Sequence, residues 1–497
     1  MQRAHTRGCI SIAILLACSA CAFALDPSLE VSQYAHTAWK IREGFATGTI
    51  HEIAQTPDGY LWLATESGLL RFDGVRTVPW QPPPGDRLPS TDIRSLVAGR
   101  DGTLWLGTAK GLASWKGDTL TQFPQLAGFD VYTLLRDHEG TVWAGGVMWE
   151  AGGSQPGKLC AIKGGDVHCD GSDGTFSFGV TAAYEDHRGN LWLGAGNGLW
   201  RWRPGSPNHY ELPAAKQSSL PALVFNRNAL VEGEHENLLV AGPGGLRQVI
   251  DGKIKGYSFP PNPSMSPQFN EPATLLRDRN GGLWIGTLDR GILHVHQGRT
   301  DVYSQSDGLT GNAVESFFED REGNIWVSTT AGLDRFRDYA IPTISIKQGL
   351  SSPFVVCVLA ARDGSVWLGT TDGLNRWKDG QVTIYRKRTA ATAAQSPNAK
   401  TPTQDPAAKS ANAIQYIPLP GNYIDSLYQD AQGRIWVATH QGVGYFENGR
   451  FMRFTGMQIT YAIPITGDSS GNIWAASSEQ GLCRLRMGKP VECIPWT

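Results

Sequence analysis

Short apolar runs alternate with glycine-containing turns along almost the whole chain. The recurring unit is an apolar strand, an Asp-x-x-Gly-type turn, an apolar-Trp-apolar segment that ends in small residues, and a Gly-Leu segment that enters a second hairpin. Each unit of about 40–45 residues predicts four strands, which is typical of one blade of a β-propeller. The central segments of the ten copies lie at 61–65, 104–108, 142–145, 191–194, 238–241, 283–287, 325–329, 366–370, 435–439 and 473–476. The fifth copy, at 238–241, lacks the tryptophan.

The unit around Trp326 shows how one blade is built. Residues 313–319 form the first predicted strand, 324–328 the second and 332–336 the third, and the turn between the first two begins with Asp320. An aspartate in such a turn caps backbone N–H groups. A tryptophan that recurs at one strand position packs between neighbouring sheets, and small residues two places later allow close approach. We therefore interpret the tryptophan series as core and not as a ligand cage.

Ten blades exceed one ring, because closed propellers have about four to eight blades. We predict an all-β chain with a seven-bladed β-propeller over residues 25–340 and an incomplete second propeller of about three blades over 341–497. Residues 34–41 precede the first complete unit and are expected to supply the outer strand of blade seven. Residues 341–346 are expected to open the second ring in the same way.

The second predicted ring has two irregularities. Residues 386–411 are rich in Ala, Thr, Pro, Gln and Lys without apolar periodicity, which predicts a disordered insertion between strands. Three blades also leave unpaired strand edges and an exposed apolar face. We therefore expect the remainder to be marginally stable alone and interpret the chain as a truncated or split reading frame.

Composition narrows the classes of function. Hydrophobic residues make up 41% and charged residues 18%, so a large core is possible. The net charge is −2 and no basic patch is present, which argues against nucleic acid as a partner. The chain has 59 glycines and 17 tryptophans but only 6 methionines, which favours short strands with tight turns over helices.

Residues 1–24 are typical of an export signal. They combine a basic start and an apolar run with Ala22-Phe23-Ala24, which fits a small-x-small cleavage site before Leu25. A periplasmic mature chain follows. In the alternative, a lipoprotein signal, Cys18 would carry a lipid. No other stretch of the sequence is long and apolar enough to span a membrane.

Two cysteine pairs lie in predicted hairpins. A two-residue Gly-Gly turn places Cys160 and Cys169 directly opposite each other, which allows either a disulfide or two reduced thiols. Cys483 and Cys493 bracket a similar hairpin with a looser turn, and a disulfide is again feasible. Cys357 sits in an apolar run and is expected to be a buried small hydrophobe.

The repeat resembles the two-component regulator propeller family. The first unit carries Thr37-Ala38-Trp39, Glu43-Gly44, the run from Ile50 to Trp62 and Gly68-Leu69-Leu70-Arg71-Phe72-Asp73-Gly74. The segment Gly332-Leu333-Asp334-Arg335-Phe336 is similar to the same signature. The resemblance covers nearly all of the predicted mature chain.

This resemblance implies an extracytoplasmic sensor of a bacterial membrane receptor. In full-length members of this family, a signal peptide, two seven-bladed propellers, a small β-sandwich and a membrane helix precede a histidine kinase or a diguanylate cyclase. The resemblance also implies that the full-length receptor can form a homodimer. The sequence contains no phosphoacceptor, ATP-binding or cyclase motif, so we expect this chain to bind rather than catalyse.

Few residues suggest chemistry. His294-Val295-His296 places two imidazoles on one strand face, but no third metal ligand is near in sequence, and polar residues facing solvent are the favoured interpretation. His138 and His187 lie in blade turns and are expected to be plainly exposed. The sequence predicts no catalytic residues, no metal site and no cofactor.

The loops that enter the innermost strands are the candidate binding site. They would line the axial mouth of the first ring, where aromatic and amide side chains suit a neutral polar ligand such as a carbohydrate. The alternative is that they are ordinary turn residues. The candidate residues are Thr49, Asp92, Tyr132, Trp149, Phe178, Asn270 and Asn312.

Three functions fit a propeller of this kind. The first is a ligand-sensing receptor region. The second is an exported enzyme that acts on a polysaccharide or resembles streptogramin lyases, which carry a similar repeat. The third is a scaffold that binds another protein. All three share the fold, so fold alone does not separate them.

Overall fold

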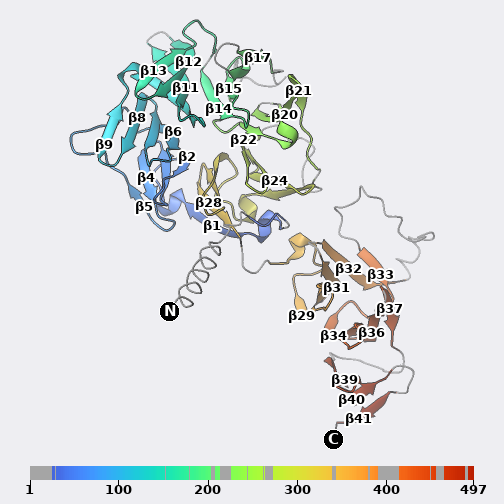
Figure 1. The fold of residues 1–497 in the computed structure, drawn as a ribbon. Helices are drawn as coiled ribbons and strands as arrows, with labels where there is room; N and C mark the ends of the chain where they lie inside the picture. The colour runs from blue at the N-terminus through green and yellow to red at the C-terminus, as the bar shows by residue number, and fades with distance from the viewer. Residues whose placement is uncertain are drawn as a thin grey trace, which may run out of the picture. The chain divides into compact units, whose positions relative to one another are not determined.

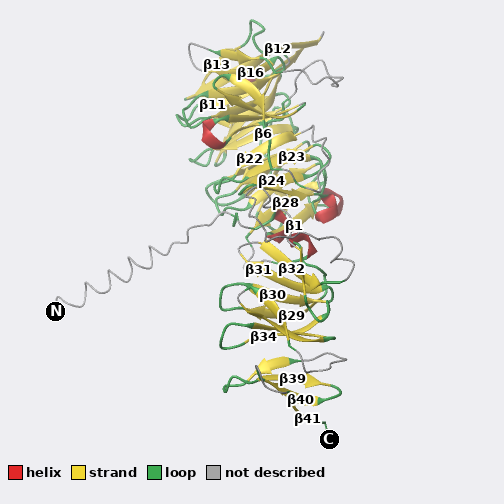
Figure 2. Ribbon diagram, turned by 90° about the vertical axis from the view of Figure 1, so that its right-hand side faces the viewer, coloured by secondary structure: helices red, strands yellow, loops and turns green. Residues whose placement is uncertain are grey.

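The computed structural model divides the chain into two compact units, Met1–Ala340 and Ile341–Thr497, which we describe separately. Almost all regular structure is strand (Figure 2), and the predicted all-β propeller fold is confirmed. No helix among the described residues is long and apolar enough to cross a membrane. The structure describes residues 25–27, 29–150, 153–177, 179–202, 207–212, 225–242, 244–260, 262, 272–338, 343–378, 381–389, 414–447, 449–454, 464–486 and 491–496. The predicted signal peptide lies outside these residues.

The first unit contains seven four-stranded antiparallel sheets within the described ranges. Six of them are built from consecutive strands. The first three sheets are β2 (Ile50–Gln55), β3 (Leu61–Thr65), β4 (Gly68–Phe72) and β5 (Thr77–Pro79); β6 (Ile93–Ala98), β7 (Leu104–Thr108), β8 (Gly111–Lys116) and β9 (Thr119–Gln122); and β10 (Phe129–Arg136), β11 (Val142–Glu150), β12 (Gly153–Lys163) and β13 (Asp166–Asp170). The next three are β14 (Val180–Glu185), β15 (Leu191–Ala195), β16 (Gly198–Trp202) and β17 (Asn208–Tyr210); β18 (Leu230–Glu232), β19 (Leu238–Gly242), β20 (Gly245–Ile250) and β21 (Lys253–Gly256); and β22 (Pro272–Arg277), β23 (Leu283–Thr287), β24 (Ile292–His296) and β25 (Arg299–Tyr303).

The seventh sheet closes the ring with strands from both ends of the unit. It contains β26 (Val314–Glu319), β27 (Ile325–Thr329) and β28 (Gly332–Arg337), and its outer strand is β1 (Ala35–Lys40) (Figure 1). The register runs from Ala35 opposite Arg337 to Lys40 opposite Gly332. Strand β26 also contacts β2, so the innermost strands form a continuous circle.

An indole–carboxylate contact recurs in most blades. The turn aspartate accepts backbone N–H groups with one oxygen and the blade tryptophan's indole N–H with the other, as in Asp320, where the Nε1–Oδ2 distance to Trp326 is 2.7 Å. In the first blade Thr56 replaces the aspartate. The contact locks the turn to the second strand. The other pairs are Trp143–Asp137, Trp192–Asp186, Trp284–Asp278, Trp436–Asp430 and Trp474–Asp468.

The second unit contains three sheets in its described residues. They are β29 (Val355–Ala360), β30 (Val366–Thr370), β31 (Gly373–Lys378), β32 (Gln381–Lys387) and β33 (Ile414–Ile417); β34 (Ile424–Gln429), β35 (Ile435–Thr439), β36 (Gly442–Glu447) and β37 (Arg450–Arg453); and β38 (Ile465–Gly467), β39 (Ile473–Ser477), β40 (Gly481–Leu485) and β41 (Glu492–Ile494). Strand β33 pairs in parallel with β32 and adds a fifth strand to the first of these sheets.

Two predicted boundaries in this unit are wrong. Arg386 and Lys387 belong to β32 and not to the predicted insertion, because Ile384 and Tyr385 are buried and an ion pair to Asp372 holds Arg386. Residues 390–411 of that insertion lie outside the described residues. Residues 343–345 are not a strand and lead into a single 3-10 turn at Ile346–Gln348.

Candidate functional site

The innermost strands carry a recurring β-bulge near their entrance. One residue of each bulged strand is skipped in the pairing with the next strand, and each skipped residue lies eleven positions before the blade's tryptophan. A bulge breaks the alternation of the strand and re-aims a side chain. Asn228, eleven positions before Leu239, stands at the same place in the fifth blade. The bulged residues of the first unit are His51, Arg94, Tyr132, Thr181, Ala273 and Glu315.

Some of the predicted mouth residues lie close to these bulges. Asp92 precedes the bulged Arg94 by two residues, Thr49 precedes His51 by two, and Tyr132 is itself bulged. The Asn312 side chain instead accepts a hydrogen bond from the backbone N–H of Gln305 at 2.8 Å, so its own loop uses it.

Three predicted mouth residues cannot be placed. Phe178, Asn270 and the side chain of Trp149 lie outside the described part of the chain. Sequence reasoning also missed the bulged residues other than Tyr132, although their constant spacing from the tryptophan was a usable signal.

An alternating row of charges links the first three blades. Asp92 Oδ2 lies 3.0 Å from Arg94 Nη2, and Arg94 Nε lies 3.7 Å from Oδ1 of the buried Asp130. His51 Nε2 lies 4.0 Å from the other oxygen of Asp92. Arg94 is therefore held between two aspartates and largely compensated.

Two hydrogen bonds cross the axis of the ring. Asn228 Nδ2 donates to Glu52 Oε1 at 3.3 Å, and Arg227 Nε donates to the Tyr132 carbonyl at 3.0 Å. These contacts join the fifth blade to the first and the third, which are not its neighbours. The side chains therefore meet inside the axial channel and bridge it.

Burial changes the protonation of the groups in this channel. It lowers the pKa of His51 to about 4, and the positive charges of Arg227 and Arg94 act in the same direction, so the imidazole is neutral at pH 7. Burial raises the pKa of Glu52 to about 7, against the opposing effects of Arg227 and Asn228. It also raises the pKa of Glu315, which Arg227 opposes.

A cavity of about 770 Å³ continues along the axis. It is lined by residues of all seven innermost strands, and Glu52 and Asn228 form part of its wall. Most of its other lining residues are apolar, such as Ile53, Leu230 and Phe317. The polar side chains of the mouth therefore stand at the entrance of a mainly apolar channel.

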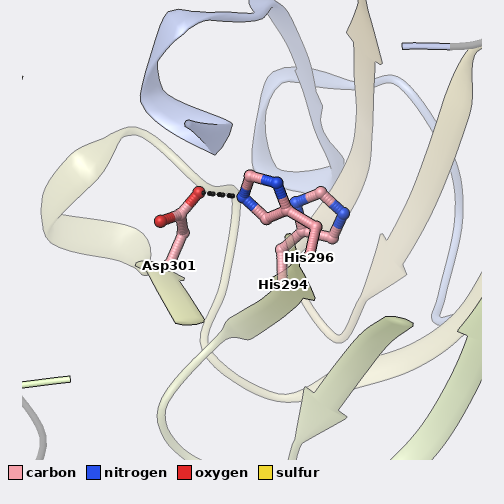
Figure 3. A group of neighbouring side chains, drawn as sticks. All are labelled: His294, His296 and Asp301. Atoms are coloured by element: carbon pink, nitrogen blue, oxygen red, sulfur yellow. Dashed lines mark hydrogen bonds and ion pairs between the residues drawn. The ribbon is translucent and has the colours of Figure 1, made fainter. Parts of the chain in front are cut away.

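The predicted solvent-facing position of His294 and His296 is wrong, because both are buried (Figure 3). His296 is 2.7 Å through Nδ1 from the Pro27 carbonyl and 2.8 Å through Nε2 from Asp301, so it anchors the segment before β1. His294 stacks on His296 at 4.3 Å with 14° between the rings and also on Trp284.

Asp301 is a third potential metal ligand beside His294 and His296, and the sequence did not reveal it. Ligand atoms of the three residues lie close enough together to surround an ion. The lone pairs of stacked imidazoles lie in two parallel ring planes, however, and do not converge on one point. In this arrangement the cluster fastens the chain before β1 to β24.

His138 and His187 are exposed, but they are not without partners. The backbone N–H of His138 donates to Glu185 of the next blade at 2.8 Å, and the ring also bonds that carboxylate, which raises the pKa of His138. His187 makes the same pair of contacts with Glu232. The expected exposure of both histidines is confirmed, and these turn residues also clasp adjacent blades.

The structure joins both cysteine pairs by disulfides. Cys160 and Cys169 lie directly opposite each other, as do Cys483 and Cys493, and each pair has a Cα–Cα distance of 4.0 Å. Cys357 is free and only half-buried against β34, with its Sγ 3.8 Å from the Ile424 carbonyl. The expectation that it is a buried small hydrophobe is wrong, because no residue of β29 is buried.

Three segments match the family model described as "Two component regulator propeller": residues 87–110, 308–331 and 418–441. Each segment spans the entrance of a blade and its first hairpin, which carries Trp105, Trp326 or Trp436. The matches confirm the resemblance that the repeat indicates. A search of curated protein sequences finds no match.

Two solved extracellular domains from B. thetaiotaomicron share the fold. The domain of the proposed hybrid two component system BT3049 is 17% identical, with a TM-score of 0.53 over 93% of this chain and 72% of that one. The domain of BT4673 is 20% identical, with a TM-score of 0.50 over 91% of this chain. The chain spans only 58% of the length of that second domain.

A virginiamycin B lyase from Staphylococcus aureus has lower similarity. It is 12% identical, with a TM-score of 0.45 over 62% of this chain and all of the lyase. Similarity at this level has no bearing on function.

Proposed function

Because the chain carries repeats of the two component regulator propeller family, we propose that it is the ligand-sensing region of a signal-transduction receptor of the histidine kinase type, located outside the cytoplasm. Its own task in this proposal is to bind a small molecule and not to catalyse a reaction. The extracellular domains that share its fold, the predicted export signal at residues 1–24 and the two disulfides support this location.

The convergence of bulged side chains in the axial mouth is the observation that carries the proposal. His51 is 8% exposed, and neither of its ring nitrogens has a hydrogen-bond partner among the described residues. An unpaired buried polar group costs free energy, about 1–3 kcal/mol, and this cost falls when a ligand supplies the partner. A cluster of side chains that leaves a buried polar group unpaired at an accessible mouth, at a cost in stability, is typical of a binding site.

A ligand screen by thermal denaturation tests this proposal. Polar small molecules such as sugars, amines and organic acids are added to the full chain, and a binder raises Tm in proportion to its saturation of the site. We expect at least one class to raise Tm by several degrees, and His51→Ala or Arg94→Ala to abolish the rise. The proposal is wrong if no class has an effect, or if the effect survives both substitutions.

Export is tested separately. The protein is recovered from the periplasmic fraction of the producing cell and its N-terminus is sequenced. We expect Leu25 to be the first residue. A lipid-bearing Cys18 at the N-terminus would instead support the lipoprotein alternative, and an intact Met1 would contradict export.

A further inference from the structure

The axial channel of the first unit has an apolar level between two polar ends. The residues that form this level recur at fixed places in the repeat, eight and nine positions before the blade's tryptophan, or before Leu239 in the fifth blade. Both places carry an aliphatic or aromatic residue in all seven blades, and every one of these residues lines the cavity of about 770 Å³. The ring of innermost strands therefore encloses a continuous apolar wall.

The residues eight positions before the tryptophan present much of this wall to the cavity. Ala54 and Val231 are buried. The other five are half-exposed, and four of them also pack against the clusters between blades, so their accessible surface faces the channel. Apolar surface left in water costs free energy, which an apolar ligand recovers by covering it. The five residues are Val97, Leu135, Tyr184, Leu276 and Phe318.

The bridge across the axis closes this channel on the side of the mouth. Glu52 and Asn228, which are hydrogen-bonded at 3.3 Å, line the cavity at that end. Arg227 crosses the axis to the Tyr132 carbonyl at 3.0 Å. His51 does not line the cavity. The bridge therefore separates the channel from the polar site of the proposed function.

At the opposite end the channel reaches the last residues of the innermost strands. Gln55, Glu232 and Arg277 line it there and are half-exposed, so this end is open to solvent. Gln55 Nε2 donates to Glu322 Oε2 at 3.0 Å, and Arg277 Nε donates to the Glu232 carbonyl at 3.1 Å. From Glu52 to Gln55 the strand advances three residues, which makes the channel about 10 Å deep below the bridge.

Hydrogen bonding separates the channel from the mouth. His51 and Thr181 in the mouth hold buried side-chain polar atoms without a partner among the described residues, whereas no residue that lines the cavity does. At the apolar level the Tyr184 hydroxyl is the one polar side-chain group, and an ordered water needs two to four polar partners. An apolar group gains affinity when it displaces poorly ordered water. The channel therefore favours an apolar ligand.

We propose that the channel below the bridge binds the aliphatic chain of a small amphiphile, which enters from the end opposite the mouth and leaves its polar head at the rim of Gln55, Glu232 and Arg277. This second site goes beyond the proposed function. Its volume of about 770 Å³ lies within the range of ligand pockets, about 300–1,000 Å³. Strands of all seven blades surround the chain, and the polar rim keeps the head in water.

Isothermal titration calorimetry on the full chain tests the preference for an aliphatic chain. The probes are 1-butanol, 1-hexanol and 1-octanol, which share one hydroxyl head and differ only in chain length. Each added methylene that enters the channel should tighten binding by about fourfold. The heat capacity change on binding should be negative, because apolar surface is buried. Affinities that do not rise with chain length, or no binding of 1-octanol, would overturn the inference.

Substitutions then locate the chain. Val97→Phe adds a ring inside the channel and should weaken 1-octanol binding by at least about tenfold, the effect of keeping two methylenes outside. Val78→Phe is the matched control, since Val78 is 51% exposed on the outer strand β5. Ala183→Leu narrows the same channel from the fourth blade and gives a second test if Val97→Phe does not fold, which unfolding curves show. An equal loss in Val78→Phe, or unchanged binding in both channel variants, would contradict the site.

The channel site and the mouth fail separately. A polar compound that raises Tm through His51, while 1-octanol does not bind, would support the ligand-sensing function and refute the channel site. Binding of 1-octanol that Val97→Phe weakens, without a response to any polar class in the thermal screen, would refute the polar site and leave the channel site standing.

Discussion

The two units use one repeat, but β29, the first innermost strand of the second unit, is far more exposed than its counterpart β26 in the first. Val314 in β26 and Val355 in β29 both lie twelve residues before their blade's tryptophan, and they are 1% and 40% exposed. Phe317 and Val358, nine residues before it, are 4% and 61% exposed. The same pattern of apolar residues therefore gives a buried strand in β26 and an open face in β29, whereas Ile424 of β34, at the same repeat position in the second unit, is 0% exposed.

Local contacts do not differ in this way. Trp326 donates to Asp320 at 2.7 Å in the first unit, and Trp436 donates to Asp430 at 2.8 Å in the second. Hairpins, turns and the indole–carboxylate contact form within one blade, whereas burial of an innermost strand depends on the sheets at its sides. The comparison teaches that the repeat encodes the blade and that ring closure completes the core.

Closure of the first unit depends on β1 and the residues beside it. Trp39 stacks on Trp326 at 5.6 Å and meets Phe72 edge-on. His36 bonds the fully buried Asp334 at 2.8 Å. The segment at the corresponding place in the second unit, residues 343–345, is not a strand.

Removing β1 should have the largest effect, because it should take from the first unit the stability that distinguishes it from the second. A chain that lacks residues 1–43 is expected to lose the outer strand of the seventh sheet together with the contacts of Trp39, which amounts to most of the roughly 5–15 kcal/mol that stabilises a domain. Limited proteolysis and circular dichroism should show that the first unit is degraded and unfolded.

The matched control is a chain of residues 25–340, which should resist protease. Residues 341–497 alone should be cut rapidly. A second unit that survives as well as the first would contradict the role assigned to closure.

Loss of a disulfide should have the next largest effect. Replacing Cys160 and Cys169 by serine, or Cys483 and Cys493, removes a short covalent loop that is worth about 2.5 kcal/mol in the chain-entropy model. The same free energy shifts Tm further in a smaller unit, because the entropy of unfolding scales with size. Calorimetry should therefore show a larger fall in Tm for the second unit, and equal falls would show that the two units unfold together.

The two equivalent valines give a direct test of burial. Val314→Ala should lower the free energy of unfolding by about 2 kcal/mol, because it removes apolar surface and leaves a cavity in a closed core. Val355→Ala, at the same repeat position on the open face, should change it by less than about 0.5 kcal/mol. Urea denaturation of the full chain measures both. Equal losses would indicate that β29 is covered in solution.

The indole–carboxylate contact should contribute equally in both units. Trp326→Phe and Trp436→Phe each remove one hydrogen bond to a carboxylate, which costs about 1.5 kcal/mol beyond the loss of ring area. Trp105→Phe and Trp367→Phe are the controls, since Gly99 and Ala361 replace the aspartate in their blades. Denaturation midpoints compare the four variants. A loss of stability from only one of Trp326→Phe and Trp436→Phe would show that the contribution of the indole–carboxylate contact depends on closure of the ring.

The clasp between His138 and Glu185 should give the smallest effect, and it depends on pH. The hydrogen bond and charge of Glu185 raise the pKa of His138 in the folded chain, so folding favours the protonated ring. This stabilisation is present below about pH 6.5, the unfolded pKa, and is lost as pH rises through the higher folded pKa.

A comparison of Tm values tests this clasp. The difference in Tm between the native chain and His138→Gln should shrink from pH 6 to pH 9. A difference that is constant with pH would show that the ring charge has no role.

Much of the fold could be predicted because its signals are local and repeated. The Asp-x-x-Gly turn, the tryptophan six residues after its aspartate and the Gly-Gly hairpin at Cys160 and Cys169 each form within a few residues. They predicted strands, turns and opposed cysteines close to their observed positions. Errors occurred where distant segments decide the outcome, as when β32 continues through Lys387 and pairs with β33.

The candidate site was less predictable, because its members are far apart in the chain. His51, Arg94, Arg227 and Glu315 come from four blades. Three of them lie eleven residues before a blade tryptophan, but that spacing does not show which side chains of different blades meet. Apart from Tyr132, which is itself bulged, the loop residues chosen from the sequence and placed by the structure lay two or three residues before the bulges. The aromatic and amide residues of the chosen loops suggested a neutral ligand, whereas the assembled mouth contains charged side chains.

The sequence by itself determined the repeat, the all-β fold and the contacts inside each blade, because the residues involved are neighbours in the chain. Only the tertiary structure decided which side chains share the axial channel, which protonation states burial imposes on His51 and Glu52, and why β26 is buried while β29 is exposed. These properties arise when the closed ring of sheets buries side chains that are distant in the chain. The sequence of a single repeat does not determine which of these side chains meet.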